Sequence, residues 1–315
     1  MPVSPRLIAF FALFASLSVG IIYSIVFNTY LDTSDPLISS LPHPLHHHSY
    51  FARKSNIFNT LFVKRAWGWT SFAFFALFFT SPAIVRTRKR VGQYVLATVV
   101  WAAFTTWFFG PAIFERVVSY SGGQCVVILP SPNNVSSASF LNIPAEYCHT
   151  RTRLSPDTHP ELFISPFLLT QSQWSTRPRY LKGHDVSGHV FLLTLSVLFL
   201  ADQLKPSIMM YANQRMATYV PGAHRLATYA TFALSALWVW MVFTTGVYWH
   251  TPIEKVSGFG ELHFYICILS NQYPQQLDWE VISSPGCQNF YSSGMSPLNS
   301  VIAKQRQRTN VQTCM

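Results

Sequence analysis

Residues 7–30 have the sequence LIAFFALFASLSVGIIYSIVFNTY, which contains no Asp, Glu, Lys, Arg or His. A helix of about 20 apolar residues is long enough to cross the hydrocarbon core of a bilayer, so this run predicts a membrane span. The alternative is a cleaved signal peptide, because Arg6 precedes the run. The run is long for that role and lacks a clear small-residue cleavage site. Cleavage would leave the topology of the later spans unchanged.

The composition of the whole chain favours a membrane protein. Half of the 315 residues are hydrophobic and 11% are Asp, Glu, Lys or Arg, against about 25% charged residues in an ordinary soluble domain. A soluble globule of this size could not cover its surface with so little charge, and disorder needs low hydrophobicity. We therefore expect an all-α integral membrane protein.

Five further apolar runs follow the first, and the six together predict a six-span helix bundle over residues 1–273. The expected spans are 7–30, 66–85, 93–114, 186–204, 226–249 and a weaker run at 256–273. The polar residues 274–315 are expected to form a flexible cytosolic tail.

Basic residues predict the orientation of the bundle. The net charge of +10 comes largely from Lys and Arg beside apolar runs, which argues for membrane orientation and against nucleic acid. Residues 86–90 (RTRKR) form a short loop between the second and third runs, a pattern typical of the cytosolic side. This places both termini in the cytosol and the long loop 115–185 in the lumen, although Lys64 and Arg65 oppose it.

The long loop has two features that suit a lumenal location. It contains the only N-glycosylation sequon, Asn134-Val135-Ser136. It also contains Cys125 and Cys148, which could pair in an oxidising lumen or remain free.

The first candidate motif is Ser187-Gly188-His189, at the start of the run 186–204. Ser187 is a good N-cap, Gly188 allows close approach to the backbone, and the free N–H groups of the helix N-terminus favour phosphate. His189 could donate or accept a proton there. The alternative is an ordinary helix cap beside an incidental histidine.

The second candidate motif is His250-Thr251-Pro252-Ile253-Glu254, at the end of the fifth run. Pro252 disfavours helix at Thr251, so the span should end near His250, and Thr251 with Glu254 predicts a capping box for the next helix. Glu254 could also accept a hydrogen bond from the His250 ring and so support a nucleophilic or basic imidazole. Both roles stay open.

Topological parity links the two motifs. His189 begins the fourth span and His250 ends the fifth, so both histidines face the same side of the membrane in either orientation. Two histidines, a helix N-terminus and nearby cations suit phosphoryl transfer. The expected substrate-binding residues are Ser187, Gly188, Arg177, Arg179, Lys182 and Lys255.

The stretches 183–193 and 248–255 resemble the fat storage-inducing transmembrane (FIT) family, and the resemblance covers most of residues 60–273. It implies a multi-pass protein of the endoplasmic reticulum that is needed for normal lipid-droplet formation. The implied activity is hydrolysis of the diphosphate bond of fatty acyl-CoA, which gives acyl 4′-phosphopantetheine and adenosine 3′,5′-bisphosphate.

That family is in turn similar to the lipid phosphate phosphatases. By this resemblance His189 matches the general acid, His250 the nucleophile and Glu254 the acid that orients it. The phosphate-binding arginines of the phosphatases are missing or relocated, since Thr244 stands at the position of one of them and Arg177-Pro178 lies too close to Ser187 to match the other.

Together with the two motifs, the resemblance implies a fatty acyl-CoA diphosphatase that acts at the lumenal face of the endoplasmic reticulum and supports lipid homeostasis there. The alternatives are a lipid phosphate phosphatase and a non-catalytic protein that binds neutral lipid. Fatty acyl-CoA and membrane lipids, including neutral lipid, are the expected partners; protein partners are unknown. No metal or cofactor is expected, and the histidine-rich stretch 43–48 is expected to be a solvated loop.

Overall fold

The computed structural model describes residues 4–32, 42–105, 113–129, 140–150, 152–163, 175–213 and 220–260. The sequon at Asn134, most of the predicted sixth span and the predicted tail 274–315 lie outside the described residues.

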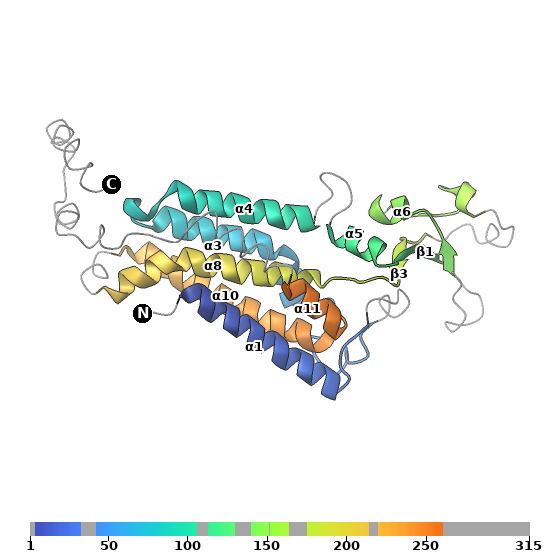
Figure 1. Ribbon diagram of the computed structural model, residues 1–315, viewed down its shortest axis with the longest axis horizontal. Helices are drawn as coiled ribbons and strands as arrows, with labels where there is room; N and C mark the ends of the chain where they lie inside the picture. Colours follow the sequence, from blue (N-terminus) through green and yellow to red (C-terminus); the bar gives the residue numbers. More distant parts are fainter. Residues whose placement is uncertain are drawn as a thin grey trace.

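Five helices lie side by side along the long axis of the molecule (Figure 1). They are α1 (Pro5–Val26), α3 (Ala66–Thr80), α4 (Arg88–Thr105), α8 (Gly188–Ala212) and α10 (Gly222–Tyr248). Among the described residues, three of them, α1, α8 and α10, are both long and apolar enough to cross a membrane. The chain is thus mostly helical, as its composition predicts.

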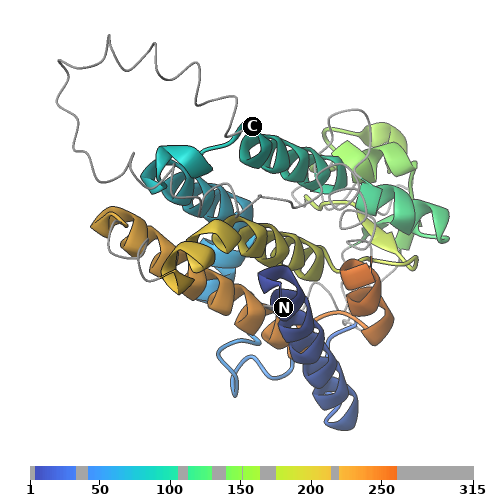
Figure 2. The same cartoon turned by 60° about the vertical axis from the view of Figure 1, so that its left-hand side comes forward.

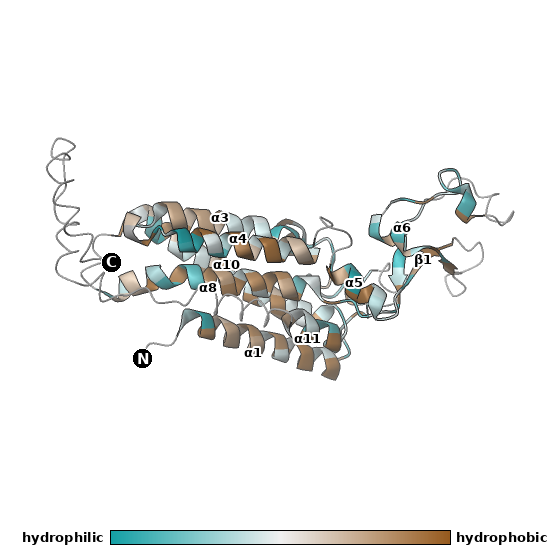
Figure 3. Cartoon of the chain, turned by 45° about the horizontal axis from the view of Figure 1, so that its top comes forward, coloured by the Kyte–Doolittle hydropathy of each residue, from teal (hydrophilic) through white to brown (hydrophobic). Residues whose placement is uncertain are grey.

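Helix α8 is the centre of the bundle, because α1, α3, α4 and α10 all contact it (Figures 1 and 2). Most of its side chains are buried, including Phe191 and Phe199, which are fully enclosed. By contrast α1 exposes large apolar side chains such as Phe11 and Ile22. Figure 3 shows that hydrophobic residues make up much of α1, which is what a lipid-facing helix requires.

The helices extend beyond the predicted spans where charged residues find partners inside the bundle. Helix α8 continues past the predicted end at 204 to Ala212, and Asp202 within it lies 3.6 Å from the Arg6 guanidinium of α1. Helix α4 starts at Arg88, before the predicted 93, and Arg90 donates to the side chain of Gln203 at 2.9 Å. Paired charges of this kind are tolerated where unpaired ones are not.

Short irregular elements flank α3. A π-helical turn, η1 (Phe58–Phe62), and a 3₁₀ turn, η2 (Val63–Arg65), precede it, and a second 3₁₀ turn, η3 (Ala83–Val85), follows it. Helical backbone therefore runs without a break from Phe58 to Thr80. The short helix α11 (Pro252–Gly260) packs against α8 and α1 and includes the predicted start of the sixth span.

The expectation of an all-α fold is wrong in the segment 115–185. There β1 (Gln124–Ile128), β2 (Phe140–Asn142) and β3 (Arg179–Leu181) form an antiparallel sheet in the order β2-β1-β3. The β-branched residues Val126 and Val127 are fully buried, which favours a strand over a polar loop. The sheet lies beyond the end of the bundle at which α8 begins (Figure 1).

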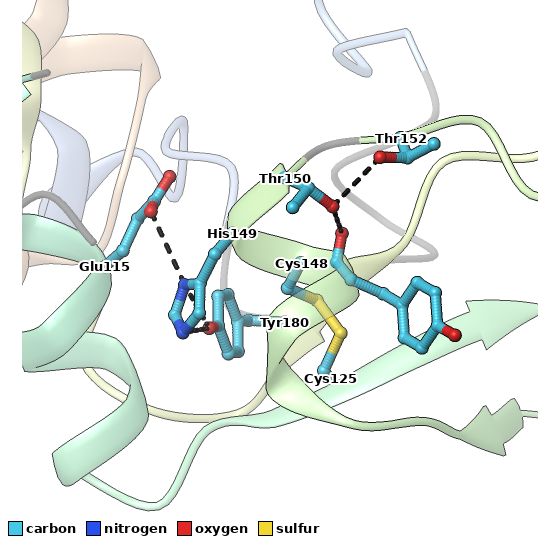
Figure 4. The surroundings of a disulfide bond; sticks show 8 residues. Glu115, Cys125, Cys148, His149, Thr150, Thr152 and Tyr180 are labelled. Atoms are coloured by element: carbon cyan, nitrogen blue, oxygen red, sulfur yellow. Dashed lines mark hydrogen bonds and ion pairs between the residues drawn. A yellow bond between two sulfur atoms is a disulfide. The ribbon is translucent and has the colours of Figure 1, made fainter. Parts of the chain in front are cut away.

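Three short helices surround this sheet: α5 (Ile113–Tyr120), α6 (Ala145–Thr150) and the 3₁₀ turn η5 (Pro160–Leu162). Cys125 on β1 and Cys148 on α6 form a disulfide (Figure 4), the pairing that the sequence left open. Both cysteines belong to a small apolar cluster with Val127 and Phe163. The segment therefore folds around a core of its own.

The packing of α1 on α10 depends on Gly20. A Cβ atom at Gly20 would lie 2.8 Å from the carbonyl oxygen of Phe243 in α10. Gly20→Ala should force the helices apart and lower the stability of the purified protein by about 1–3 kcal/mol, measured by thermal unfolding in detergent. Gly68→Ala is the control, because a Cβ at Gly68 would meet nothing within 4 Å. Equal melting temperatures for Gly20→Ala and the wild type would contradict this packing.

Candidate active site

The structure brings His189 and His250 to the same end of the bundle. His189 lies in the first turn of α8, and His250 follows the last residues of α10. Both line a cavity of about 850 Å³, and both also line a neighbouring cavity of about 240 Å³. The two histidines therefore stand where the two cavities meet.

The larger cavity has an apolar part and a charged part. Trp101 and Phe104 of α4, Phe114 of α5 and Leu192 of α8 form the apolar part. The charged part contains four cations and two carboxylates: Lys64, Arg177, Arg179, Lys182, Glu115 and Asp185. Such a cavity can accept an amphiphilic ligand with a negatively charged head.

The backbone at the end of α10 holds His250 in an unusual conformation. Trp249 is extended and His250 has a φ of 62°, in the left-handed region that costs energy for a side chain of this size. The last carbonyl groups of α10 are bound by other segments: the Thr29 hydroxyl donates to Val247 O at 2.8 Å, and Leu31 N–H donates to Tyr248 O at 3.0 Å. These bonds fix the chain just before His250.

His43 completes this arrangement, and the expectation of a solvated loop is wrong at this residue. Its side chain is buried, with Nε2 3.0 Å from both Thr29 O and Tyr248 O, while Nδ1 accepts from Leu45 N–H. Burial lowers the pKa of His43, which favours the neutral ring that this pattern requires.

Among the residues that the structure describes, no group of three His, Cys, Asp or Glu is placed to hold a metal ion.

Glu254 caps the start of α11, as the sequence predicts, and its carboxylate also lies near the His250 ring. Its carboxylate accepts a hydrogen bond from Thr251 N–H at 2.8 Å, which caps the start of α11. The same oxygen lies 3.7 Å from His250 Nδ1. Asp185, just before α8, brings a second carboxylate to 3.9 Å from His250 Nδ1. Both carboxylates therefore lie on the Nδ1 side of the His250 ring.

The pKa values of the two carboxylates shift in opposite directions. Burial acts to raise the pKa of Glu254, but bonds with His250 and Thr251 outweigh it, and the pKa is lowered overall. The pKa of Asp185 is raised, first by burial and further by the charge of Glu254, against the opposing effect of His250. The ionised form is thus favoured for Glu254 and disfavoured for Asp185, so Glu254 is the better suited of the two to stabilise a positively charged imidazole.

The two sequence motifs are in direct contact. Ser187 N–H donates to Glu254 O at 3.1 Å, and His184 Nε2 lies 2.8 Å from the Ser257 hydroxyl. A Cβ atom at Gly258 would lie 2.7 Å from Ser187 O, so α11 and the start of α8 pack backbone to backbone. This contact couples the position of Glu254 to that of His189.

The structure separates the expected substrate-binding residues into two sets. Gly188, Arg177, Arg179 and Lys182 line the larger cavity. Ser187 is the N-cap residue of α8, but its side chain is buried and makes no cap bond. Lys255 is fully buried and donates to Gly246 O at 2.7 Å and to the Ser24 hydroxyl at 3.1 Å. These contacts assign Lys255 to helix packing rather than to substrate binding.

Lys64 is a site residue that sequence reasoning missed. It lies in η2, directly after the π-helical turn, and it lines both cavities together with the two histidines. π-Helical turns within helices often occur at functional sites. The sequence held one indication of this role. Cytosolic loops are usually the ones rich in Lys and Arg, and Lys64 is a cation on the side predicted to be lumenal.

The fold and this end of the bundle define a helical membrane protein with a histidine–carboxylate site. The chain belongs to the fat storage-inducing transmembrane protein (FIT) family, whose sequence model matches residues 47–269. The match includes both motifs and confirms the resemblance seen in the sequence.

Curated relatives in several organisms are similar to this chain. The acyl-coenzyme A diphosphatase fit1 of Schizosaccharomyces pombe is 33% identical over 233 residues, which cover 73% of this chain and 77% of the relative. The acyl-coenzyme A diphosphatase FITM2 of Xenopus tropicalis is 27% identical and that of Homo sapiens 25% identical, each over 69% of this chain and 71% of the relative. No solved structure shows a significant match.

Two substitutions at Glu254 separate capping from charge. Glu254→Gln keeps an oxygen that can accept from Thr251 N–H, whereas Glu254→Ala removes it. Glu254→Ala should lower the free energy of unfolding by about 0.5–2 kcal/mol, the usual effect of losing a cap, and Glu254→Gln should stay close to the wild type. Thermal unfolding of the purified variants measures this. Equal losses in both variants would show that the cap does not depend on this oxygen.

Proposed function

We propose that the chain is a fatty acyl-CoA diphosphatase, which hydrolyses the diphosphate bond of acyl-CoA to acyl 4′-phosphopantetheine and adenosine 3′,5′-bisphosphate. The observation that carries the proposal is that His189 and His250 line one cavity that also contains four cations and an apolar wall. The relatives from three organisms, each named an acyl-coenzyme A diphosphatase, support it.

The cavity suits the two ends of an acyl-CoA molecule. The apolar wall of Trp101, Phe104 and Leu192 comes from bundle helices and would receive the acyl chain. The cations Lys64, Arg177, Arg179 and Lys182 would bind the phosphates of the head group. The diphosphate would then lie beside the histidines, between the apolar and the charged parts.

In the proposed reaction, His250 acts as the nucleophile. Its Nε2 forms a bond to one phosphorus of the diphosphate, and the bond from that phosphorus to the bridging oxygen breaks. His189 gives its proton to the departing bridging oxygen. Glu254, 3.7 Å from Nδ1, stabilises the positive charge on the His250 ring. Water then hydrolyses the phosphohistidine, with His189 accepting a proton from it.

We also propose a topology of six spans, with both termini and the tail 274–315 in the cytosol and the site in the lumen of the endoplasmic reticulum. Arg6 lies near the start of α1 and Arg88 starts α4, at the end of the bundle away from the histidines (Figure 1), which agrees with a basic cytosolic face. The helical run Phe58–Thr80 is roughly 34 Å long at the rise of an α-helix, enough to span a bilayer. The disulfide fits an oxidising lumen, where Asn134 would be glycosylated.

In this location the activity would support lipid-droplet formation and lipid homeostasis, with membrane lipids, including neutral lipid, as neighbours of the bundle. Two alternative functions predict different behaviour. A lipid phosphate phosphatase would prefer phosphatidate to acyl-CoA as substrate. A non-catalytic lipid-binding protein would support lipid droplets without either histidine.

Purified protein with oleoyl-CoA as substrate should release adenosine 3′,5′-bisphosphate. His189→Ala and His250→Ala should each reduce this release by about 10²-fold or more, the usual effect of losing a general acid or nucleophile. His48→Ala is the control, because its exposed side chain lies in the loop that precedes η1. Full turnover in either site variant would contradict the mechanism, and preferential hydrolysis of phosphatidate would point to the phosphatase.

A further inference from the structure

The cations of the site come from two different places. Lys64 lines both cavities, as do His189 and His250. Arg177, Arg179 and Lys182 line the larger cavity only. In the proposed reaction His250 attacks a phosphorus whose leaving oxygen is protonated by His189, so this phosphorus lies where the cavities meet. Lys64 is the cation that lines both cavities there. The second group of cations therefore faces a part of the substrate beyond the reacting diphosphate.

The two arginines form a basic surface at and just before the start of β3. Arg179 begins β3 and lies opposite Val126 of β1. Arg177 lies two residues earlier, after Thr176, which makes an isolated β-bridge with Leu154. Both arginines line the larger cavity. Two guanidinium groups at one cavity suit a phosphate, which each can bind through two hydrogen bonds.

This surface is held rigidly. Cys125 lies opposite Tyr180 in the β1–β3 pair, and its disulfide to Cys148 ties the strand to α6 (Figure 4). The Tyr180 hydroxyl lies 3.1 Å from His149 Nδ1, which is 3.5 Å from the Glu115 carboxylate of α5. The backbone that carries the arginines is thus fixed on folding, before the substrate binds, which favours affinity.

The same segment is fixed to the bundle next to the histidines. The ring of Phe114 at the start of α5 packs edge-on against Phe191 of α8, with centroids 5.2 Å apart. Phe191 lies two residues after His189. The arginine pair therefore has a defined position relative to the reacting centre, as a second binding point on one extended substrate requires.

Resting on the proposed function, we propose that Arg177, Arg179 and Lys182 form a second phosphate subsite, which binds the ribose 3′-phosphate of acyl-CoA. A phosphomonoester carries a charge of about −1.5 to −2 at pH 7, so it is the most strongly charged single group of the substrate and matches a cluster of three cations. The subsite makes the enzyme selective for CoA esters over otherwise identical esters that lack the 3′-phosphate. It also disfavours lipid phosphates, which have no second phosphate to place there.

The test compares oleoyl-CoA with oleoyl-3′-dephospho-CoA, which differ only in the group assigned to the subsite. The wild type should favour oleoyl-CoA in kcat/KM by about 10-fold to 100-fold, the range for hydrogen bonds to a charged group. The double variant Arg177→Ala/Arg179→Ala should lose this preference, because its loss in kcat/KM should be larger for oleoyl-CoA than for the dephospho substrate. A melting temperature close to that of the wild type shows that the variant is folded. Arg153→Ala, an exposed arginine of the same segment outside the cavity lining, should keep the preference.

Inhibition gives a second measure that needs no dephospho substrate. Adenosine 3′,5′-bisphosphate should inhibit the wild type about 10-fold more strongly than adenosine 5′-monophosphate, and the double variant should not distinguish them. Equal kcat/KM for the two substrates in the wild type would overturn the subsite and leave the diphosphatase intact. Equal loss of both substrates in the double variant would also overturn it, by assigning the arginines to the reacting diphosphate. No turnover of either substrate by the wild type would overturn the diphosphatase itself.

Discussion

The site depends on how the last carbonyl groups of α10 are satisfied. The last carbonyl oxygens of a helix have no hydrogen-bond donor within the helix. Burying such an oxygen without another donor costs on the order of several kcal/mol. Here Thr29, Leu31 and His43 supply the donors, from two segments far from α10 in the sequence. These bonds join the end of α1, the loop after it and α10. These bonds hold the chain at Val247 and Tyr248 and so support the left-handed backbone of His250.

A second set of contacts fixes the position of His189 relative to His250. Glu254 caps α11 with its side chain, and its backbone oxygen accepts from Ser187 at the start of α8. Lys255 ties the same helix to α1 and α10. The short helix α11 thus connects three long helices at one end of the bundle. Preorganisation of this kind places groups for reaction without an ordering cost when the substrate binds.

The sequence predicts the parts of the fold that depend on local pattern and on chain connectivity. Apolar runs predict the helices, because the length of a run limits what it can form in a membrane. Topological parity predicts that His189 and His250 face the same side of the membrane, because the chain crosses the membrane twice between them. The capping box at Thr251 and Glu254 is equally local, and the structure contains its hydrogen bond.

Other features depend on partners that the sequence does not bring close. The three-stranded sheet pairs residues 124–126 with 179–181 across a long separation, within a segment rich in Pro, Ser and Asn. Lys255 was expected to bind phosphate, but it donates a hydrogen bond to Ser24, which is 231 residues away in the sequence. It therefore contributes to helix packing. His43 and Lys64 gain their positions from the bundle end and the π-helical turn. In each case long-range packing overrides the local expectation.

The central claim is that His250 forms a covalent bond to phosphorus. Wild-type protein mixed with oleoyl-CoA, stopped with alkali within the first turnover and digested for mass spectrometry, tests it most directly, because a phosphorus–nitrogen bond survives alkali. The account predicts a peptide with a phosphoryl-linked half of the substrate on His250, and no such peptide from His250→Ala. Release of adenosine 3′,5′-bisphosphate at the full wild-type rate with no adduct on His250 would contradict the account.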